Sequence, residues 1–342
     1  MAAEVAPAVS GPPIGLRRSL RLNGVLVAAM LLFVATAFVV AQSGGVPFSL
    51  ALYAPLWPIF GVLAAVALGL RAVLPARWRI AERLTLAAPV LLVAPAFFSA
   101  FTSLKSGLSR LHPYSWDATI GGWDRALFGR DAWRVLQPLL GHPPVTFALS
   151  VLYSGWHAAM LTIFGGLCLS LGRPALRLQA LLALVGCWAL LGTWAATALA
   201  SVGPCFVGPL HIAAVDGFAP QAAYLKAANR QLPIWEFAEQ SRLLNAAASG
   251  KPALGSGISA MPSMHVAVAM LMMLVAWRFG RRAGVVGSLY FVAIVLGSIH
   301  LGWHYAMDGA AGAMGAGLIW LAAGLIAALA LGRSGRPANA DD

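Results

Sequence analysis

The chain has 342 residues, of which 60% are apolar and only 10% are charged. A soluble globular domain carries roughly 25% charged residues, so the composition excludes an ordinary soluble protein and is typical of a polytopic membrane protein. The net charge of +12 needs no nucleic-acid partner, because Lys and Arg gather in the cytoplasmic loops of membrane proteins, near anionic lipid headgroups.

Apolar stretches of about 20 residues, the length that crosses ~30 Å of hydrocarbon, recur along the chain. They predict an all-α bundle of about eight membrane spans, at residues 22–42, 48–70, 83–103, 144–170, 177–200, 262–279, 284–302 and 308–331. The first stretch follows Arg17, Arg18 and Arg21, so a secretory signal peptide is the alternative there. Its apolar run is longer than the roughly 7–15 residues of a signal core, which favours a retained helix.

Arginines concentrate on the side of the membrane that holds both termini, while the other side is nearly balanced in charge. Because cytoplasmic loops are rich in Lys and Arg, both termini are predicted to be cytoplasmic. The opposite side receives two long connections, at 103–143 and 201–261, and most of the histidines. We therefore expect an integral protein of a bacterial cytoplasmic membrane whose functional groups face the periplasm.

The stretch SAMPSMHV begins the span at 262–279. Pro262 suits the first helical position, where its missing N–H costs nothing. Ser263 and the backbone N–H groups of the first turn can then face an anion with the positive end of the helix dipole. His265 falls in the same turn. Taken alone, this histidine is equally consistent with a ring that bonds a loop carbonyl.

A second polar stretch, GSIHLGWHYAMDGAAG, lies between the last two spans. His304 and Asp308 are four residues apart, a spacing at which two side chains on one helical turn can meet. A carboxylate on one imidazole nitrogen fixes the tautomer and leaves the other nitrogen free as a nucleophile or base. The alternative is an interfacial pair that only caps a helix. His300, with Trp303 and Tyr305, is predicted to belong to an aromatic belt at the membrane surface.

The spans at 262–279 and 284–302 form an antiparallel hairpin, which brings His265 and His304 to one membrane face. Two imidazoles and a carboxylate at a helix N-terminus are suited to phosphoryl transfer, with one histidine as nucleophile and the other as proton donor. A proton relay in a transporter is a more distant alternative. It predicts polar groups at the middle of the spans, whereas here they gather at one face.

These two stretches resemble the second and third signature motifs of the type-2 phosphatidic acid phosphatase superfamily, Pro-Ser-Gly-His and Ser-Arg-x5-His-Tyr-x-x-Asp. The longer stretch GISAMPSMHVAVAM, WDRALFG at 123–129 and GPCF at 203–206 are most similar to the inositol phosphorylceramide synthase-like branch. The resemblance implies a six-helix catalytic core at 83–331 and two additional helices at 22–74. The charge distribution makes the N-terminal segment at 1–21 and the C-terminal tail at 332–342 cytoplasmic.

The resemblance also implies roles for the residues. His304 would become phosphohistidine, Asp308 would orient it and His265 would be the general acid, with no metal and no other cofactor. The three cysteines have no metal-ligand spacing either. Substrate-binding candidates are Ser263, Lys105, Ser298, His300 and Gly203.

This sequence departs from the family motifs at three places. Ser298 stands where the third motif has its Arg, and Met264 stands where the second has its Gly. The first motif, Lys-x6-Arg-Pro, is absent from its usual place. A near match, KSGLSRLHP, offers Lys105 as the missing positive charge, although a lysine that snorkels at a helix end is an equal alternative.

The residues leave the phosphoryl acceptor open. The sequence favours a phosphotransferase that acts on a phospholipid or lipid phosphate and passes the group to a lipid or polyol alcohol such as inositol. A lipid phosphate phosphatase, with phosphatidic acid or a polyprenyl phosphate as substrate and water as acceptor, is the alternative. The expected partners are therefore membrane lipids and an alcohol acceptor, without nucleic acid, and the oligomeric state stays open.

Overall fold

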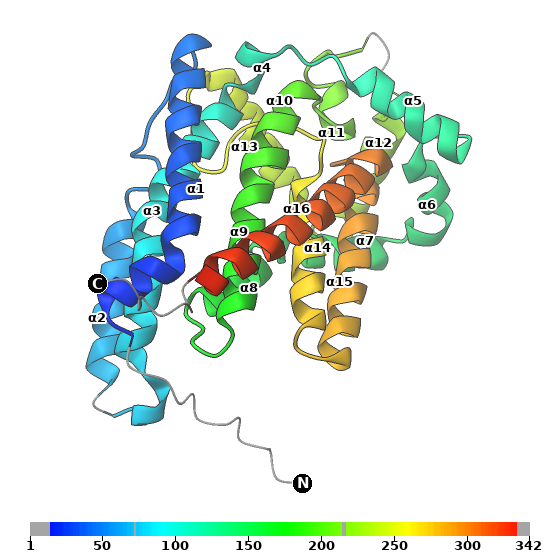
Figure 1. The fold of residues 1–342 in the computed structure, drawn as a ribbon. Helices are drawn as coiled ribbons and strands as arrows, with labels where there is room; N and C mark the ends of the chain where they lie inside the picture. Colours follow the sequence, from blue (N-terminus) through cyan, green and yellow to red (C-terminus); the bar gives the residue numbers. More distant parts are fainter. Residues whose placement is uncertain (1–13, 72, 214–216, 334–342) are drawn as a thin grey trace.

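The computed structural model describes residues 14–71, 73–213 and 217–333, and every regular element within these ranges is helical (Figure 1). Six stretches of the described chain are long and apolar enough to cross a membrane. They are α1 (Leu16–Ser43), α3 (Ile80–Ser106), α7 and α8 (Pro143–Ser154 and Trp156–Cys168), α9 to α10 (Pro174–Ala198), α15 (Arg281–His300) and α16 (Ala306–Arg333). The protein is thus an all-α integral membrane protein with six candidate spans.

Two of the eight predicted spans correspond to shorter apolar helices, α2 (Leu56–Leu70) and α14 (Met264–Trp277). At about 1.5 Å per residue, α14 extends only about 21 Å, which is less than the ~30 Å of hydrocarbon. Residues 260–263, which lead into it, are all buried. The start of α14 is therefore enclosed by protein, and this is where His265 lies.

Buried polar side chains tie α1 to the rest of the bundle. Ser19 Oγ donates to the carbonyl of Thr85 over 2.7 Å, and Asn23 Nδ2 donates to that of Leu86 over 2.9 Å. A polar group in hydrocarbon must find its partner within the protein, so these bonds fix α1 against α3. Within the described residues, α1 is packed into the bundle through these bonds. The predicted terminal segments at 1–21 and 332–342 lie largely outside the described residues.

The long connections meet at one end of the bundle, at the top of Figure 1. Their helices are α4 (Leu108–Leu111), α5 (Asp117–Phe128), α6 (Ala132–Leu140), α11 (Pro204–Val207), α12 (Ala219–Asn229) and α13 (Glu236–Ser249). The N–H groups of Ser115 and Trp116 donate to the carbonyl of Ala200, and Tyr114 Oη donates to that of Ile258. The first connection is thereby joined to the second, and together they cover the ends of the spans.

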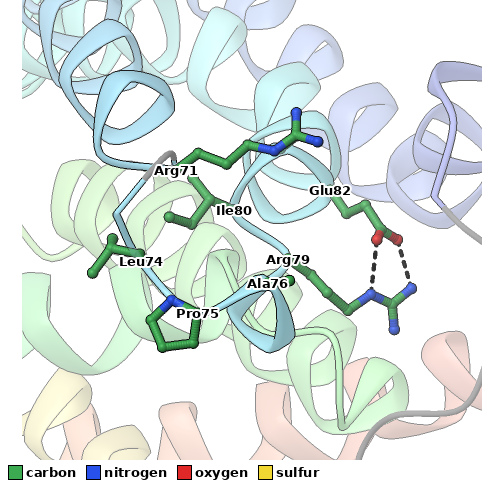
Figure 2. Close-up of a pocket in the computed structure, with 8 residues that line it drawn as sticks. Arg71, Leu74, Pro75, Ala76, Arg79, Ile80 and Glu82 are labelled. Atoms are coloured by element: carbon green, nitrogen blue, oxygen red, sulfur yellow. Dashed lines mark hydrogen bonds and ion pairs between the residues drawn. The ribbon is translucent and has the colours of Figure 1, made fainter.

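A hollow of about 200 Å³ lies at the other end of α3, between α2, the short helix η1 (Ala76–Trp78) and the first turn of α3 (Figure 2). Arg71 and the ion pair between Arg79 and Glu82 line it, and the paired atoms are 2.6 Å apart. Its lining contains no histidine. It belongs to the predicted cytoplasmic side and is not the functional site.

The charge distribution and this arrangement generate a topology prediction. Reporter fusions within 105–140 and 205–255 should be active outside the cytoplasm, because these connections share the end of the bundle with few arginines. A fusion in the turn at 278–283, between α14 and α15, should be active in the cytoplasm. Fusion activity measured in intact cells checks both, and an external signal from 278–283 would contradict the orientation.

Candidate active site

The segment between α15 and α16 holds the first histidine. His304 Nδ1 lies 3.3 Å from Asp308 Oδ2, and both side chains are enclosed, with 6% and 0% of their surfaces exposed. The same carboxylate oxygen accepts the backbone N–H of Tyr305 over 3.0 Å. Because Asp308 faces Nδ1, it favours a proton on that nitrogen and leaves Nε2 as the nitrogen with a free lone pair.

The second histidine lies opposite the first. His265 is the second residue of α14, and its ring centroid is 6.1 Å from that of His304. Tyr153 stacks on the His265 ring at 4.5 Å, and Trp156 lies against it at 4.7 Å. Trp156 Nε1 also donates to the His265 carbonyl over 3.0 Å. Aromatic side chains of the broken span α7–α8 therefore fix the His265 ring.

A direct backbone bond joins the two motifs. The N–H of Ser263 donates to the carbonyl of Asp308 over 2.9 Å. Gly312 makes the approach possible, since a Cβ atom there would lie 2.4 Å from the Ser263 carbonyl oxygen. Ser263 is the N-cap of α14, and its Oγ accepts the N–H of Val266 over 3.4 Å. The expectation that Pro262 begins this helix was wrong, because the cap falls one residue after it.

The substitution of Met264 for the family's glycine has a local explanation. Met264 is buried against Gly192, where a Cβ atom would lie 3.1 Å from the methionine sulfur. Gly192 lies in η2 (Cys187–Ala195), a π-helical segment. This segment falls within the predicted span at 177–200. Because Gly192 has no side chain, η2 leaves space for the side chain of Met264 on α14.

Lys105 lies in the last turn of α3 and is close enough to His265 for their charges to interact. Its Nζ is 5.6 Å from the centroid of the Phe101 ring. Gly257, in the connection above, passes so close that a Cβ atom there would lie 2.6 Å from Lys105 Cγ. Lys105 is thus covered by the second connection, on the same side of the bundle as the histidines.

Ser298 and His300 bond within the bundle. Ser298 is fully buried, and its carbonyl accepts the N–H groups of Trp303 and His304 over 3.1 and 3.0 Å. His300 Nε2 lies 2.9 Å from Thr146 Oγ1, and only 1% of the residue is exposed. Tyr305 is buried as well, at 3%. The predicted aromatic belt was therefore wrong, because these rings pack inside the protein instead of at its surface.

Gly203, in the second connection, supports residues 302–308, which include His304 and Asp308 and are called the catalytic segment below. Its φ of +87° is in the region that glycine adopts readily, and a Cβ atom there would lie 2.4 Å from the Trp303 carbonyl oxygen. Its N–H donates to Asp117 Oδ1 over 2.9 Å, and the N–H of Cys205 donates to the carbonyl of Gly302 over 2.8 Å. The GPCF stretch thus holds the segment around His304 through backbone contacts.

Sequence reasoning missed three ionisable residues near this site. His157 of α8 lies edge-on to His265, with ring centroids 6.3 Å apart, but its place inside an apolar span gave no signal. Asp117 of α5 accepts the N–H of Gly203 and the hydroxyl of Tyr305, and Asp124 of α5 accepts the N–H of Ala306. Burial raises the pKa of both carboxyls, and the backbone N–H groups that they accept act in the opposite direction.

The arrangement of His265, His304 and Asp308 agrees with the family to which the sequence is matched. The sequence profile of the PAP2 superfamily matches residues 118–322, more than half of the chain, and this range includes the segments that carry His265 and His304. This chain belongs to the PAP2 superfamily. No curated protein and no solved structure matched it. Membership makes the protein an enzyme, a membrane phosphatase or phosphotransferase of lipid phosphates, which replaces the transporter alternative.

Proposed function

We propose that this PAP2 enzyme is a phosphotransferase that passes a phosphoryl or phospho-headgroup from a lipid to an alcohol through phosphohistidine at His304. The observation that carries the proposal is the pairing of His304 Nδ1 with buried Asp308 while His265 faces the same ring. A carboxylate on Nδ1 directs the lone pair of Nε2 outward, and it stabilises the positive charge that the imidazole gains when it is phosphorylated.

In the first step, Nε2 of His304 attacks phosphorus and the bond from phosphorus to the leaving oxygen breaks. His265, in its protonated form, gives its proton to that oxygen. In the second step, the acceptor hydroxyl gives its proton to His265 and its oxygen attacks phosphorus, which breaks the bond to Nε2. The enzyme returns to its starting state, and His265 serves as acid and then as base.

In this proposal, several groups stabilise the negative charge of the phosphate. The helix offers no acceptor to the N–H groups of Met264 and His265 at the start of α14, while Ser263 Oγ accepts that of Val266. The positive end of the helix dipole also lies there. Lys105 supplies a cation in place of the family's Arg at position 298. Four further residues remain candidates for substrate binding because they lie around the two histidines: Ser263, Ser298, His300 and Gly203.

Enclosure of the nucleophile favours an alcohol acceptor. His304 is 6% exposed, and the second long connection packs against the carbonyl of Trp303 and against Lys105. A site that excludes water protects a reactive phosphoenzyme from hydrolysis, so the intermediate survives until an alcohol arrives. This supports the inositol phosphorylceramide synthase-like branch. The ring of His157, edge-on to His265, favours the second candidate, a lipid phosphate phosphatase, because a second imidazole can pass on the proton that water loses to the base.

We expect Asp308→Asn to bind substrate normally and to turn it over slowly, because the amide can present an N–H to Nδ1 and stabilise the wrong tautomer. A similar change at a comparable histidine lowers kcat by about 10⁴-fold. A chelator should leave the wild type active, since no step in the proposal uses a metal ion. Turnover of both proteins with and without EDTA checks this. Inactivation of the wild type by EDTA, reversed by a divalent ion, would contradict the mechanism.

The acceptor is tested with purified protein in detergent and a panel of phospholipids and lipid phosphates, with and without inositol and lipid alcohols. Transfer predicts a new phosphorylated alcohol and little free phosphate. His304→Ala should abolish both products, and Arg134→Ala, on an exposed helix of the first connection, should abolish neither. Stoichiometric phosphate release that no alcohol suppresses would show that the second candidate, hydrolysis, is correct.

A further inference from the structure

One face of α5 carries two carboxylates toward the catalytic segment. The buried residues of this helix include Asp117, Gly121 and Asp124, which follow one another at spacings of four and three and so lie on one stripe. Asp117 Oδ1 accepts the hydroxyl of Tyr305 over 3.0 Å. A Cβ atom at Gly121 would lie 3.4 Å from the Tyr305 ring. On the opposite face of α5, Trp123, Ala126 and Leu127 are exposed.

Asp124 completes the hydrogen bonding of the segment that joins α15 to α16. The N–H groups of residues 303 and 304 donate to Ser298, and that of residue 305 donates to Asp308. The next two N–H groups, those of Ala306 and Met307, donate to Asp124 Oδ2 and Oδ1 over 2.8 and 3.0 Å. Every backbone N–H from 303 to 307 thus has an acceptor, and the last two depend on α5.

The sequence of α16 explains why a remote acceptor is needed. A helix that begins at Ala306 has Tyr305 at its N-cap, and a tyrosine hydroxyl is too far from its own backbone to accept N–H groups of the first turn. Asp308, at the third helical position, reaches back to the Tyr305 N–H, which is half of a capping box. Asp124, from a different helix, accepts the N–H groups of the first two helical residues, Ala306 and Met307.

We propose that Asp124 is a positioning residue for the pair of His304 and Asp308. This inference rests on the proposed function of that pair. Asp308 Oδ2 accepts both the Tyr305 N–H and the His304 ring, so a movement of residues 305–307 changes the bond that orients the nucleophile. Asp124 prevents that movement by holding two consecutive N–H groups directly before Asp308.

Asp124 variants test this in the full-length protein. Asp124→Leu removes both acceptors and should lower kcat by roughly 10²-fold, the effect of about 1 Å of misplacement in an active site, with little change in KM. Asp124→Asn keeps one acceptor oxygen, so its kcat should lie between those of Asp124→Leu and the wild type. Asp131→Asn is the matched control, because this carboxylate of the same hairpin pairs with Arg125 and Arg134 and does not touch the catalytic segment. It should behave as the wild type.

Hydrogen exchange gives a second readout that does not depend on activity. Peptides that cover residues 303–309 should exchange faster in Asp124→Leu, and peptides from α14 should be unchanged. Wild-type exchange and wild-type kcat in Asp124→Leu would overturn the inference, as would an equal loss of kcat in the Asp131 control. If His304→Ala remains active, the proposed function fails, and the exchange of 303–309 still decides whether Asp124 holds this segment.

Discussion

Asp308 is hydrogen-bonded at both its side chain and its backbone, and the rest of the site depends on these bonds. Its carboxylate faces His304, and its carbonyl accepts the N–H of Ser263, the cap of the helix that carries His265. One residue therefore fixes both the orientation of one histidine and the position of the other. Gly312 allows this contact because it presents no side chain to the Ser263 carbonyl. The two histidines face each other because α14 and α16 approach this closely.

Much of this arrangement follows from local sequence. An all-helical membrane bundle, the contact between His304 and Asp308 and the hairpin that returns to His265 follow from apolar length and helix geometry, and they were predicted correctly. Of the eight predicted spans, six are long enough in the described chain to cross a membrane. The start of α14 was predicted at Pro262, but Ser263 is the N-cap, because its side chain can accept an N–H of the first turn. The aromatic belt was wrong because composition alone does not distinguish a ring at the lipid surface from one packed within the bundle.

The contributions of α5 and α8 could not be predicted, because they depend on tertiary contacts. Asp117 and Asp124 lie on one stripe of an amphipathic helix, but nothing in that pattern says which segment the stripe meets. His157 is part of an apolar span, directly after the break between α7 and α8, and its contact with His265 is visible only in the fold. The histidines of the second and third family motifs thus depend for their positions on residues outside these two motifs. Substituting a cap typically costs about 0.5–2 kcal/mol of stability, so such changes would affect activity before they unfold the bundle.

The central claim is that His304 carries the phosphoryl group during turnover. The most direct test is to trap that intermediate in His265→Ala with a lipid phosphate analogue whose leaving group is acidic. Such a leaving group departs without a proton donor, while the second step still lacks its base, so the phosphoenzyme should accumulate. Alkaline quenching and mass spectrometry of the peptides should place one acid-labile phosphate on His304. A phosphate on another residue, or turnover with no phosphorylated peptide, would contradict the account.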